Sequence, residues 1–320
     1  MNKVFLYLLG AGASSQVLPL ASTFTESLTI FANDLKKAGP KKPRASDADP
    51  IWGDDRDILF DAVNWLATES SNHFSVDTFA KKLFFRGDIQ NLKKLKAVLS
   101  SYLVIEQSRN HVDQRYDAFL ASILKLDSSR RVSLPDHLRI LTWNYDAQLE
   151  KAFYGFCDNQ DMVIEDIAFS KHIYRINGRC GTHPPGHIGN SFRAILNSTN
   201  KPAWRDGLNL YKEYMTEPSS PDPEINFAWE DPTHNKLKNV GVTLLSEVTD
   251  LVVIGYSFPY FNREIDDIIF KQFHNLFRVY LQFPDGVHAS IEERIKKLLL
   301  EEINIIRVAS TDLFYIPDDF

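Results

Sequence analysis

The chain has 320 residues, enough for one large or two modest domains with a proper hydrophobic core. Its formal net charge of −6 at pH 7 argues against a broad surface for nucleic acid or for an anionic membrane, and no apolar run reaches the ~18 residues of a membrane span. The two cysteines are too few for a disulfide framework, so we expect a cytoplasmic protein.

The first predicted element is a buried β-strand over residues 4–9, which runs into the glycine-containing segment Gly10–Ser14. The apolar run is short and ends at Gly10, which favours a strand over a signal peptide. Glycines let the backbone come close to a ligand, and the helix expected from about Leu20 would favour an anion at its start. A nucleotide pyrophosphate is the expected ligand. Ser15 stands where the full dinucleotide fingerprint has its third glycine, so a plain strand-to-helix turn is the alternative.

A helical region is predicted next. The basic, proline-broken stretch at 36–44 is interpreted as a solvated linker. Residues 57–126 have apolar side chains at helical spacing and almost no Pro or Gly. We therefore expect a helical subdomain at 51–129, inserted into a larger domain made of residues 1–50 and 130–320.

Strand patterns return in the second half of the chain and alternate with helices. Strands are expected at 138–143, 173–176, 251–254, 277–283 and 303–308, and helices at 236–248, 263–275 and 289–300. The segment 180–232 is rich in Pro, Gly, Asn and Ser, which predicts loops and short helices. Because nearly all-apolar strands alternate with helices, the sequence predicts an α/β fold with a doubly wound, parallel, Rossmann-like sheet.

Four predicted strand ends are unusually polar or small. They are Gly10–Ser14, Asn144–Asp146, Asn177–Gly178 and Gly255–Ser257. Each alone could be a turn, and Asn144 and Asp146 are equally good helix N-caps. Ligands of open α/β sheets bind beyond the carboxyl ends of the strands, so four such ends together favour a shared ligand.

These motifs resemble the SIR2 family, in its bacterial SIR2-like branch. Gly10–Ser14 is similar to the family's GAG-x-S loop, Thr142–Asp146 to its T-x-N-x-D motif, and Gly255–Phe258 to its late G-x-S element. The helical insertion lies where the family places its smaller domain, and the resemblance covers nearly the whole chain. It implies a SIR2-type fold.

The resemblance also implies that the chain binds NAD+. Asn144 would orient a water or hydroxyl at the glycosidic carbon, and Asp146 would support that pocket through hydrogen bonds. The residues expected to contact NAD+ are Gly10, Ala11, Gly12, Ala13, Ser14, Gly255, Tyr256 and Ser257. The implied reaction is cleavage of the nicotinamide–ribose bond through an oxocarbenium-like transition state, which fixed dipoles and carboxylates stabilise.

Two departures from the family pattern bear on activity. Asn177 stands where the family has a catalytic histidine, and the loss of a general base typically costs ~10²–10⁴-fold in rate. An amide can still bind a ribose hydroxyl or the nicotinamide carboxamide, so Asn177 joins Asn144 and Asp146 as a catalytic candidate. The chain also lacks the two C-x-x-C-like pairs of a zinc ribbon, which argues against a zinc-dependent protein deacetylase, and no metal is expected.

Neighbouring histidines leave two alternatives open. His172 precedes Asn177 on the same strand with an offset that points it to the opposite face, whereas His183 and His187 follow in a loop and could replace the missing base. Cys180 with these two loop histidines, and with Cys157 upstream, could hold a structural zinc, although the spacing matches no firm template.

The leading hypothesis is an NAD+ glycohydrolase of bacterial anti-phage defence. The resemblance implies activation by assembly into a homo-oligomer or by a companion protein such as an ATPase or Argonaute-like subunit. The alternative, which Asn177 favours, is a degenerate module that binds NAD+ or ADP-ribose as a signal without cleaving it. An oxidoreductase is disfavoured by Ser15 and by the N-Y-D motif. No direct contact with nucleic acid or with a membrane is expected.

Overall fold

The computed structural model describes residues 3–38, 54–128, 132–157, 172–181, 189–197, 203–216, 220–227, 229–230, 245–299 and 303–320. Their contacts divide the chain into two compact units. Unit 1 comprises Met1–Gln16, Val112–Gly178 and Asn226–Phe320, and unit 2 comprises Val17–His111 and Arg179–Ile225.

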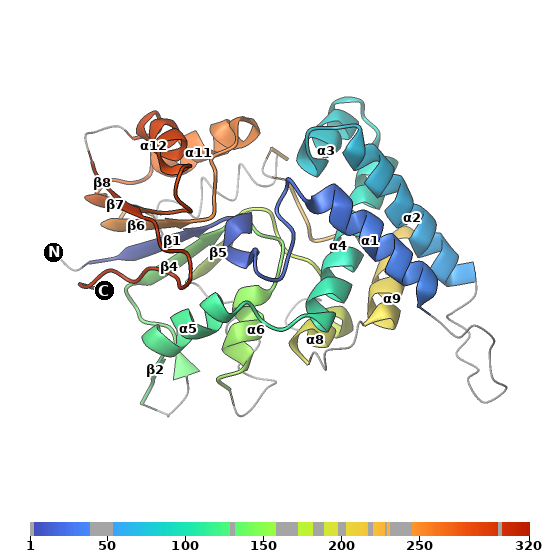
Figure 1. Cartoon of the computed structure of the whole chain (residues 1–320), viewed down its shortest axis with the longest axis horizontal. Helices are drawn as coiled ribbons and strands as arrows, with labels where there is room; N and C mark the ends of the chain where they lie inside the picture. The colour runs from blue at the N-terminus through green and yellow to red at the C-terminus, as the bar shows by residue number, and fades with distance from the viewer. Residues whose placement is uncertain are drawn as a thin grey trace. The chain divides into compact units, whose positions relative to one another are not determined.

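Unit 1 is built on a six-stranded parallel sheet (Figure 1) with the order β5-β4-β1-β6-β7-β8. Its strands are β1 (Phe5–Leu9), β4 (Leu138–Thr142), β5 (Ile173–Arg175), β6 (Asp250–Ile254), β7 (Arg278–Gln282) and β8 (Asn304–Val308). Renumbered along the chain within this sheet, the order is that of Rossmann sheets, 3-2-1-4-5-6. The direction of winding reverses between β1 and β6, where open α/β sheets bind their ligands.

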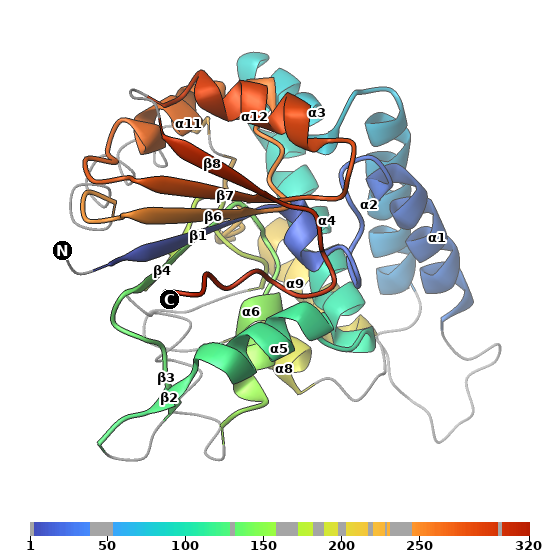
Figure 2. The ribbon, with the colours of Figure 1, turned by 60° about the vertical axis from the view of Figure 1, so that its left-hand side comes forward.

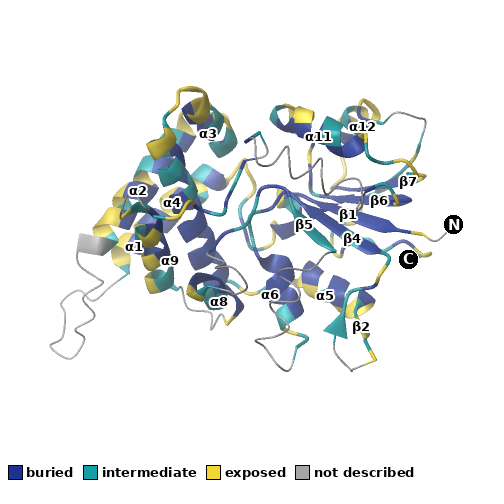
Figure 3. Ribbon diagram, turned by 180° about the vertical axis from the view of Figure 1, so that it is seen from behind, coloured by how far each residue is buried: buried dark blue, intermediate teal, exposed yellow. Residues whose placement is uncertain are grey.

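Helices flank both faces of this sheet (Figure 2). They are α5 (Gln114–Ile123) and α6 (Gln148–Tyr154) on one face, and α11 (Arg263–Phe270) and α12 (His288–Lys296) on the other. Because strand side chains alternate, β1 sends Leu6 and Leu8 into the core under α11 and α12, and Tyr7 into the core under α5 and α6. Figure 3 shows β1, β4 and β6 as buried. The predicted α/β fold with a parallel sheet is thus confirmed.

The start of the chain departs from the expected strand–loop–helix order. A four-residue 3₁₀ turn, η1 (Ala11–Ser14), follows β1 directly. The next helix, α1 (Phe24–Lys37), begins later than predicted and belongs to unit 2. The expected helix N-terminus is therefore absent from the end of the glycine loop.

Unit 2 is helical. Its helices are α1, α2 (Asp54–Ser71), α3 (Val76–Phe85), α4 (Ile89–Arg109), α8 (Asn190–Leu196) and α9 (Trp204–Met215). α1 packs on α2, while α8 and α9 pack on α4, and the rings of Phe31 and Tyr102 lie 5.0 Å apart in its interior. These bounds differ from the expected 51–129, because α1, α8 and α9 join the helical unit and α5 packs on the sheet of unit 1.

Smaller differences concern short elements. A two-stranded antiparallel pair, β2 (Lys125–Leu126) with β3 (Val132–Ser133), was not predicted, nor was the 3₁₀ turn η3 (Tyr260–Asn262). The expected helix at 236–248 lies, apart from its last residues, outside the described residues. Among the helices of the described ranges, none combines the length and apolar character needed to cross a membrane.

Candidate functional site

The carboxyl ends of four strands lie side by side in unit 1. Leu9 pairs with Thr142 in β4 and with Ile254 in β6, and Thr142 pairs in turn with Arg175 in β5. The segments that follow these residues therefore begin at the same level of the sheet. They are Gly10–Ser14, Asn144–Asp146, Asn177 and Gly255–Ser257, so the structure brings the sequence-predicted site residues to one edge.

The glycine loop packs directly against the turn after β6. The Gly10 N–H donates to the Ile254 carbonyl at 3.0 Å, and the Gly12 N–H donates to the Gly255 carbonyl at 3.1 Å. A Cβ on Gly12 would lie 2.6 Å from the Gly255 Cα, and Gly255 itself has a φ of +64°. These glycines are required by the contact between two backbone turns, which is a different reason from the expected approach to a ligand.

Most of the amides expected to hold a pyrophosphate are bonded inside the protein. Besides those of Gly10 and Gly12, the Ala13 N–H donates to the Gly10 carbonyl at 2.8 Å. Just after the expected loop, the Ser15 N–H donates to the Gly12 carbonyl at 3.4 Å. Ala11, in contrast, is exposed. A ligand at this loop would meet Ala11 and the polar side chains beyond it rather than these four amides.

Ser14 is the centre of a buried polar cluster. Its Oγ lies 3.2 Å from the Tyr116 hydroxyl and 3.4 Å from Asn144 Nδ2, which also donates to the Gly10 carbonyl at 3.0 Å. The Ser14 hydroxyl also bonds to the Asp146 carboxylate. Side chains from the end of β1 and the end of β4 are thus joined in one hydrogen-bonded group.

Asp146 has an unusual acidity within this cluster. Desolvation raises the pKa of its carboxyl from 3.8 to about 6, against the lowering effect of the Gln148 N–H and the Ser14 hydroxyl. The charge of Glu150 raises this pKa further and that of Arg175 lowers it. Asp146 therefore titrates near the range in which a general acid or base works at neutral pH.

Asn177 presents a buried acceptor at the end of β5. Its side-chain Nδ2 donates to the Trp143 carbonyl at 2.9 Å, which sets the orientation of the amide. Its Oδ1 is buried and has no hydrogen-bond partner among the described residues. Because an unsatisfied buried acceptor costs ~1–3 kcal/mol, a ligand N–H or O–H would be bound favourably there.

Two further predicted contacts lie on the turn after β6 and have different surroundings. Tyr256 is buried, stacks on Trp143 at 4.9 Å between ring centroids, and donates its hydroxyl to Asp266 at 2.9 Å. Ser257 is exposed, and its carbonyl accepts a hydrogen bond from Arg294 at 2.7 Å. Tyr256 is therefore a packing residue of the turn, whereas Ser257 is open to a ligand.

Arg115 and Tyr116 hydrogen-bond to the glycine loop, and neither was predicted from the sequence. Arg115 Nη2 donates to the Ala13 carbonyl at 3.0 Å and forms a buried ion pair with Asp113 at 2.6 Å. Tyr116 lies 102 residues from its partner Ser14. Asp113 and Arg115 look in sequence like an N-cap and the first turn of a helix, and no local pattern places them under a distant loop.

Tyr116→Phe tests how much the cluster contributes to the fold of unit 1. Removing the hydroxyl that bonds Ser14 is expected to lower the free energy of unfolding by ~1 kcal/mol, measured by urea denaturation. The control is Tyr260→Phe, because that side chain is 71% exposed. Equal losses in the two variants would contradict a contribution from the buried cluster.

The alternative histidines are only partly described. His172 Nδ1 lies 3.0 Å from the carbonyl of Leu138, at the amino end of β4 and so far from the cluster. His183 and His187 lie outside the described residues, as does the zinc alternative that uses them. Cys180 is buried, and Gln107 Nε2 donates to its Sγ at 3.4 Å. In the ranges that the structure describes, no three His, Cys, Asp or Glu side chains are placed to hold a metal.

Comparison with known proteins adds no assignment. No family model matches the chain, and no curated protein matches it. Since such a sheet is compatible with many activities, the function depends on the side chains of the site. The relevant features are the Ser14 cluster, the raised pKa of the Asp146 carboxyl and the buried Oδ1 of Asn177, which has no partner among the described residues.

Proposed function

We propose that the chain binds NAD+ at the carboxyl edge of β1, β4, β5 and β6 and hydrolyses its nicotinamide–ribose bond. The observation that carries the proposal is the hydrogen-bonded cluster of Ser14, Asn144 and Asp146. It joins two of the three motifs that resemble the SIR2 family, next to the reversal point of a sheet with the strand order of dinucleotide-binding folds.

Asp146 supplies the titratable group that the replacement of the family's histidine by Asn177 takes away. With a pKa of about 6, its carboxylate is mostly ionised at neutral pH and accepts a proton from an attacking water. Its negative charge also stabilises an oxocarbenium-like transition state. Asn144, held by the Gly10 carbonyl at 3.0 Å, orients that water or a ribose hydroxyl.

Asn177 has a binding role in this proposal. Its buried Oδ1 accepts a hydrogen bond from a ribose hydroxyl or from the carboxamide N–H of nicotinamide. A site that hydrogen-bonds the leaving group and the sugar in fixed positions favours the reacting geometry. The amide itself transfers no proton.

Release of nicotinamide from NAD+ by the purified protein, followed by chromatography, tests the proposal. Asn144→Ala is expected to reduce the rate about 10²–10³-fold, since it removes a fixed hydrogen-bonding group beside the reacting centre. Asn304→Ala, at an exposed position of β8, is the matched control and is expected to keep the wild-type rate. Equal rates in wild type and Asn144→Ala would contradict the assignment.

A second function is favoured by Asn177, which cannot act as a base. In this second function the site binds NAD+ or ADP-ribose as a signal and does not cleave it. Tight binding by calorimetry without released nicotinamide would support this alternative. Asn177→His then provides a further probe, because a restored imidazole is expected to raise turnover at a site that is otherwise complete.

The proposed cellular role and mode of activation rest only on the resemblance to the SIR2 family. We propose a cytoplasmic effector of bacterial defence that becomes active as a homo-oligomer or with a companion protein such as an ATPase or Argonaute-like subunit. Nicotinamide release that rises more steeply than in proportion to protein concentration would support activation by self-assembly. Release strictly proportional to concentration would favour an external activator.

A further inference from the structure

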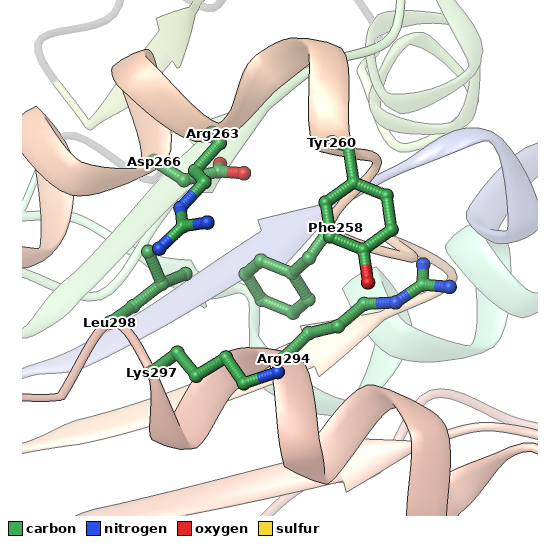
Figure 4. A pocket seen from close by; sticks show the side chains of 7 residues that line it. All are labelled: Phe258, Tyr260, Arg263, Asp266, Arg294, Lys297 and Leu298. Atoms are coloured by element: carbon green, nitrogen blue, oxygen red, sulfur yellow. The ribbon is translucent and has the colours of Figure 1, made fainter.

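A pocket of unit 1 lies between α11 and α12 (Figure 4). The residues that matter here are Phe258, Tyr260, Arg263, Asp266, Arg294 and Lys297. In Figure 4 the ring of Phe258 lies between the two helices, with Arg263 reaching in from the first residue of α11 and Lys297 from the residue that follows α12. None of these residues belongs to the proposed NAD+ site.

Three cationic side chains line the pocket, and few acidic side chains among the described residues pair with them. Arg263 is exposed and forms no ion pair with any residue that the structure describes. Lys297 pairs with Glu293 at 2.8 Å, but both side chains are largely exposed, so the pair contributes little and exchanges readily for another anion. Arg294 donates one N–H to the Ser257 carbonyl and keeps further donors for a ligand.

Asp266, the acidic residue of the pocket, does not neutralise these cations. Its carboxyl is buried and accepts the Tyr256 hydroxyl at 2.9 Å. Desolvation raises its pKa to about 8, so it is mainly uncharged at pH 7. The pocket lining therefore holds three cationic side chains and one mainly uncharged carboxyl, in a chain whose net charge is −6.

The backbone at the base of the pocket is strained. Phe258 has a φ of 49°, and among the described residues other than glycine no second one has a positive φ. Such a conformation is strained and occurs preferentially at binding sites. It buries the Phe258 ring against Tyr256 at 4.8 Å and Phe270 at 5.9 Å, which gives the pocket an apolar floor.

We propose that this pocket binds a phosphorylated small molecule through its phosphate or diphosphate group, held by Arg263, Arg294 and Lys297. Guanidinium groups match the geometry of phosphate oxygens, and a lysine adds a mobile point charge. The Phe258 floor and the Tyr260 ring, which is 71% exposed, provide apolar surface for the organic part of the ligand.

Calorimetric titration of the full chain with inorganic pyrophosphate tests this site. Saturable binding is expected for the wild type, and the double variant Arg263→Gln with Lys297→Gln is expected to bind at least about tenfold more weakly. Lys296→Gln removes the same charge from the neighbouring position of α12, where the side chain pairs with Glu292 outside the pocket. Its affinity is expected to stay within about twofold of wild type.

The same pyrophosphate titration is repeated with variants that also carry Asn144→Ala. This separates binding at the pocket from binding at the proposed NAD+ site. There, too, the pocket variants are expected to lower pyrophosphate binding, whether or not the chain cleaves NAD+. The proposal is overturned if pyrophosphate shows no saturable binding, or if Lys296→Gln weakens binding as much as the pocket variants do. It is equally overturned if Asn144→Ala alone abolishes binding. Circular dichroism of each variant checks that these exposed substitutions leave the fold intact.

Discussion

Asp146→Asn is expected to lower the rate of nicotinamide release about 10²–10⁴-fold, because the amide cannot take up a proton. Asparagine has nearly the same shape, and its Oδ1 can still accept the Gln148 N–H, which lies 3.0 Å from the aspartate oxygen. The variant therefore removes the titrating group and its charge while keeping the local geometry. The readout is kcat for NAD+ cleavage.

The pH dependence of the cleavage rate tests whether Asp146 is the titrating group. Since the carboxylate is the active form, the wild-type rate is expected to rise with pH and to be half-maximal near the pKa of about 6. The residual rate of Asp146→Asn should not follow this curve. A variant that keeps the same pH midpoint would assign the titration to another group.

Stability measurements separate this effect from unfolding. The folded state raises the pKa of Asp146 above 3.8, so it binds the proton more tightly than the unfolded state does. The contribution of the group to stability is therefore greatest below about pH 4 and is lost as pH rises through about 6. At pH 7 Asp146→Asn should be at least as stable as wild type. Asp136→Asn, at an exposed position before β4, is the control and should change neither rate nor stability.

Gly255→Ala is expected to lower the free energy of unfolding by about 2–5 kcal/mol, measured by urea denaturation. A φ of +64° costs an alanine ~1–2 kcal/mol. In addition, the new Cβ would lie 2.4 Å from the Gly12 Cα, and overpacking of this kind costs ~1–3 kcal/mol. The clash involves backbone on both sides, so no side chain can rotate away to relieve it.

Gly286→Ala is the matched control for this clash. Gly286 lies in the same unit and also has a positive φ, of +91°, but nothing lies within 4 Å of the position that its Cβ would take. That variant should show only the backbone strain. If both substitutions cost the same, the contact between the glycine loop and the turn after β6 contributes nothing measurable.

The sequence predicted the strands of unit 1 well. The central strands β1 and β6 are short, largely apolar and fully buried runs followed by small or polar residues, as burial on both faces of a parallel sheet requires. The order of polar strand ends along the chain also identified Gly10–Ser14, Asn144–Asp146 and Asn177 as neighbours at one edge. This inference holds because parallel strands place their carboxyl ends together.

Other features depended on contacts between residues far apart in the chain. The membership of α1, α8 and α9 in the helical unit follows from their packing and has no local signal. In sequence Arg115 and Tyr116 look like ordinary helix residues, and only the folded structure shows that they hydrogen-bond to Ala13 and Ser14 of the glycine loop. The acidic residues at the end of the chain also make a long-range contact, since Asp319 forms an ion pair with Arg278 at 2.6 Å.

The sequence by itself determined the class of fold and the positions of the polar strand ends, because local hydrophobic patterning and the geometry of parallel strands are sufficient for both. The tertiary structure decided what each of these residues does. Whether a glycine meets a ligand or another turn, and whether an aspartate titrates near pH 4 or near pH 6, depends on which groups surround it and how far water is excluded. Those surroundings come from segments that the chain brings together only when it folds.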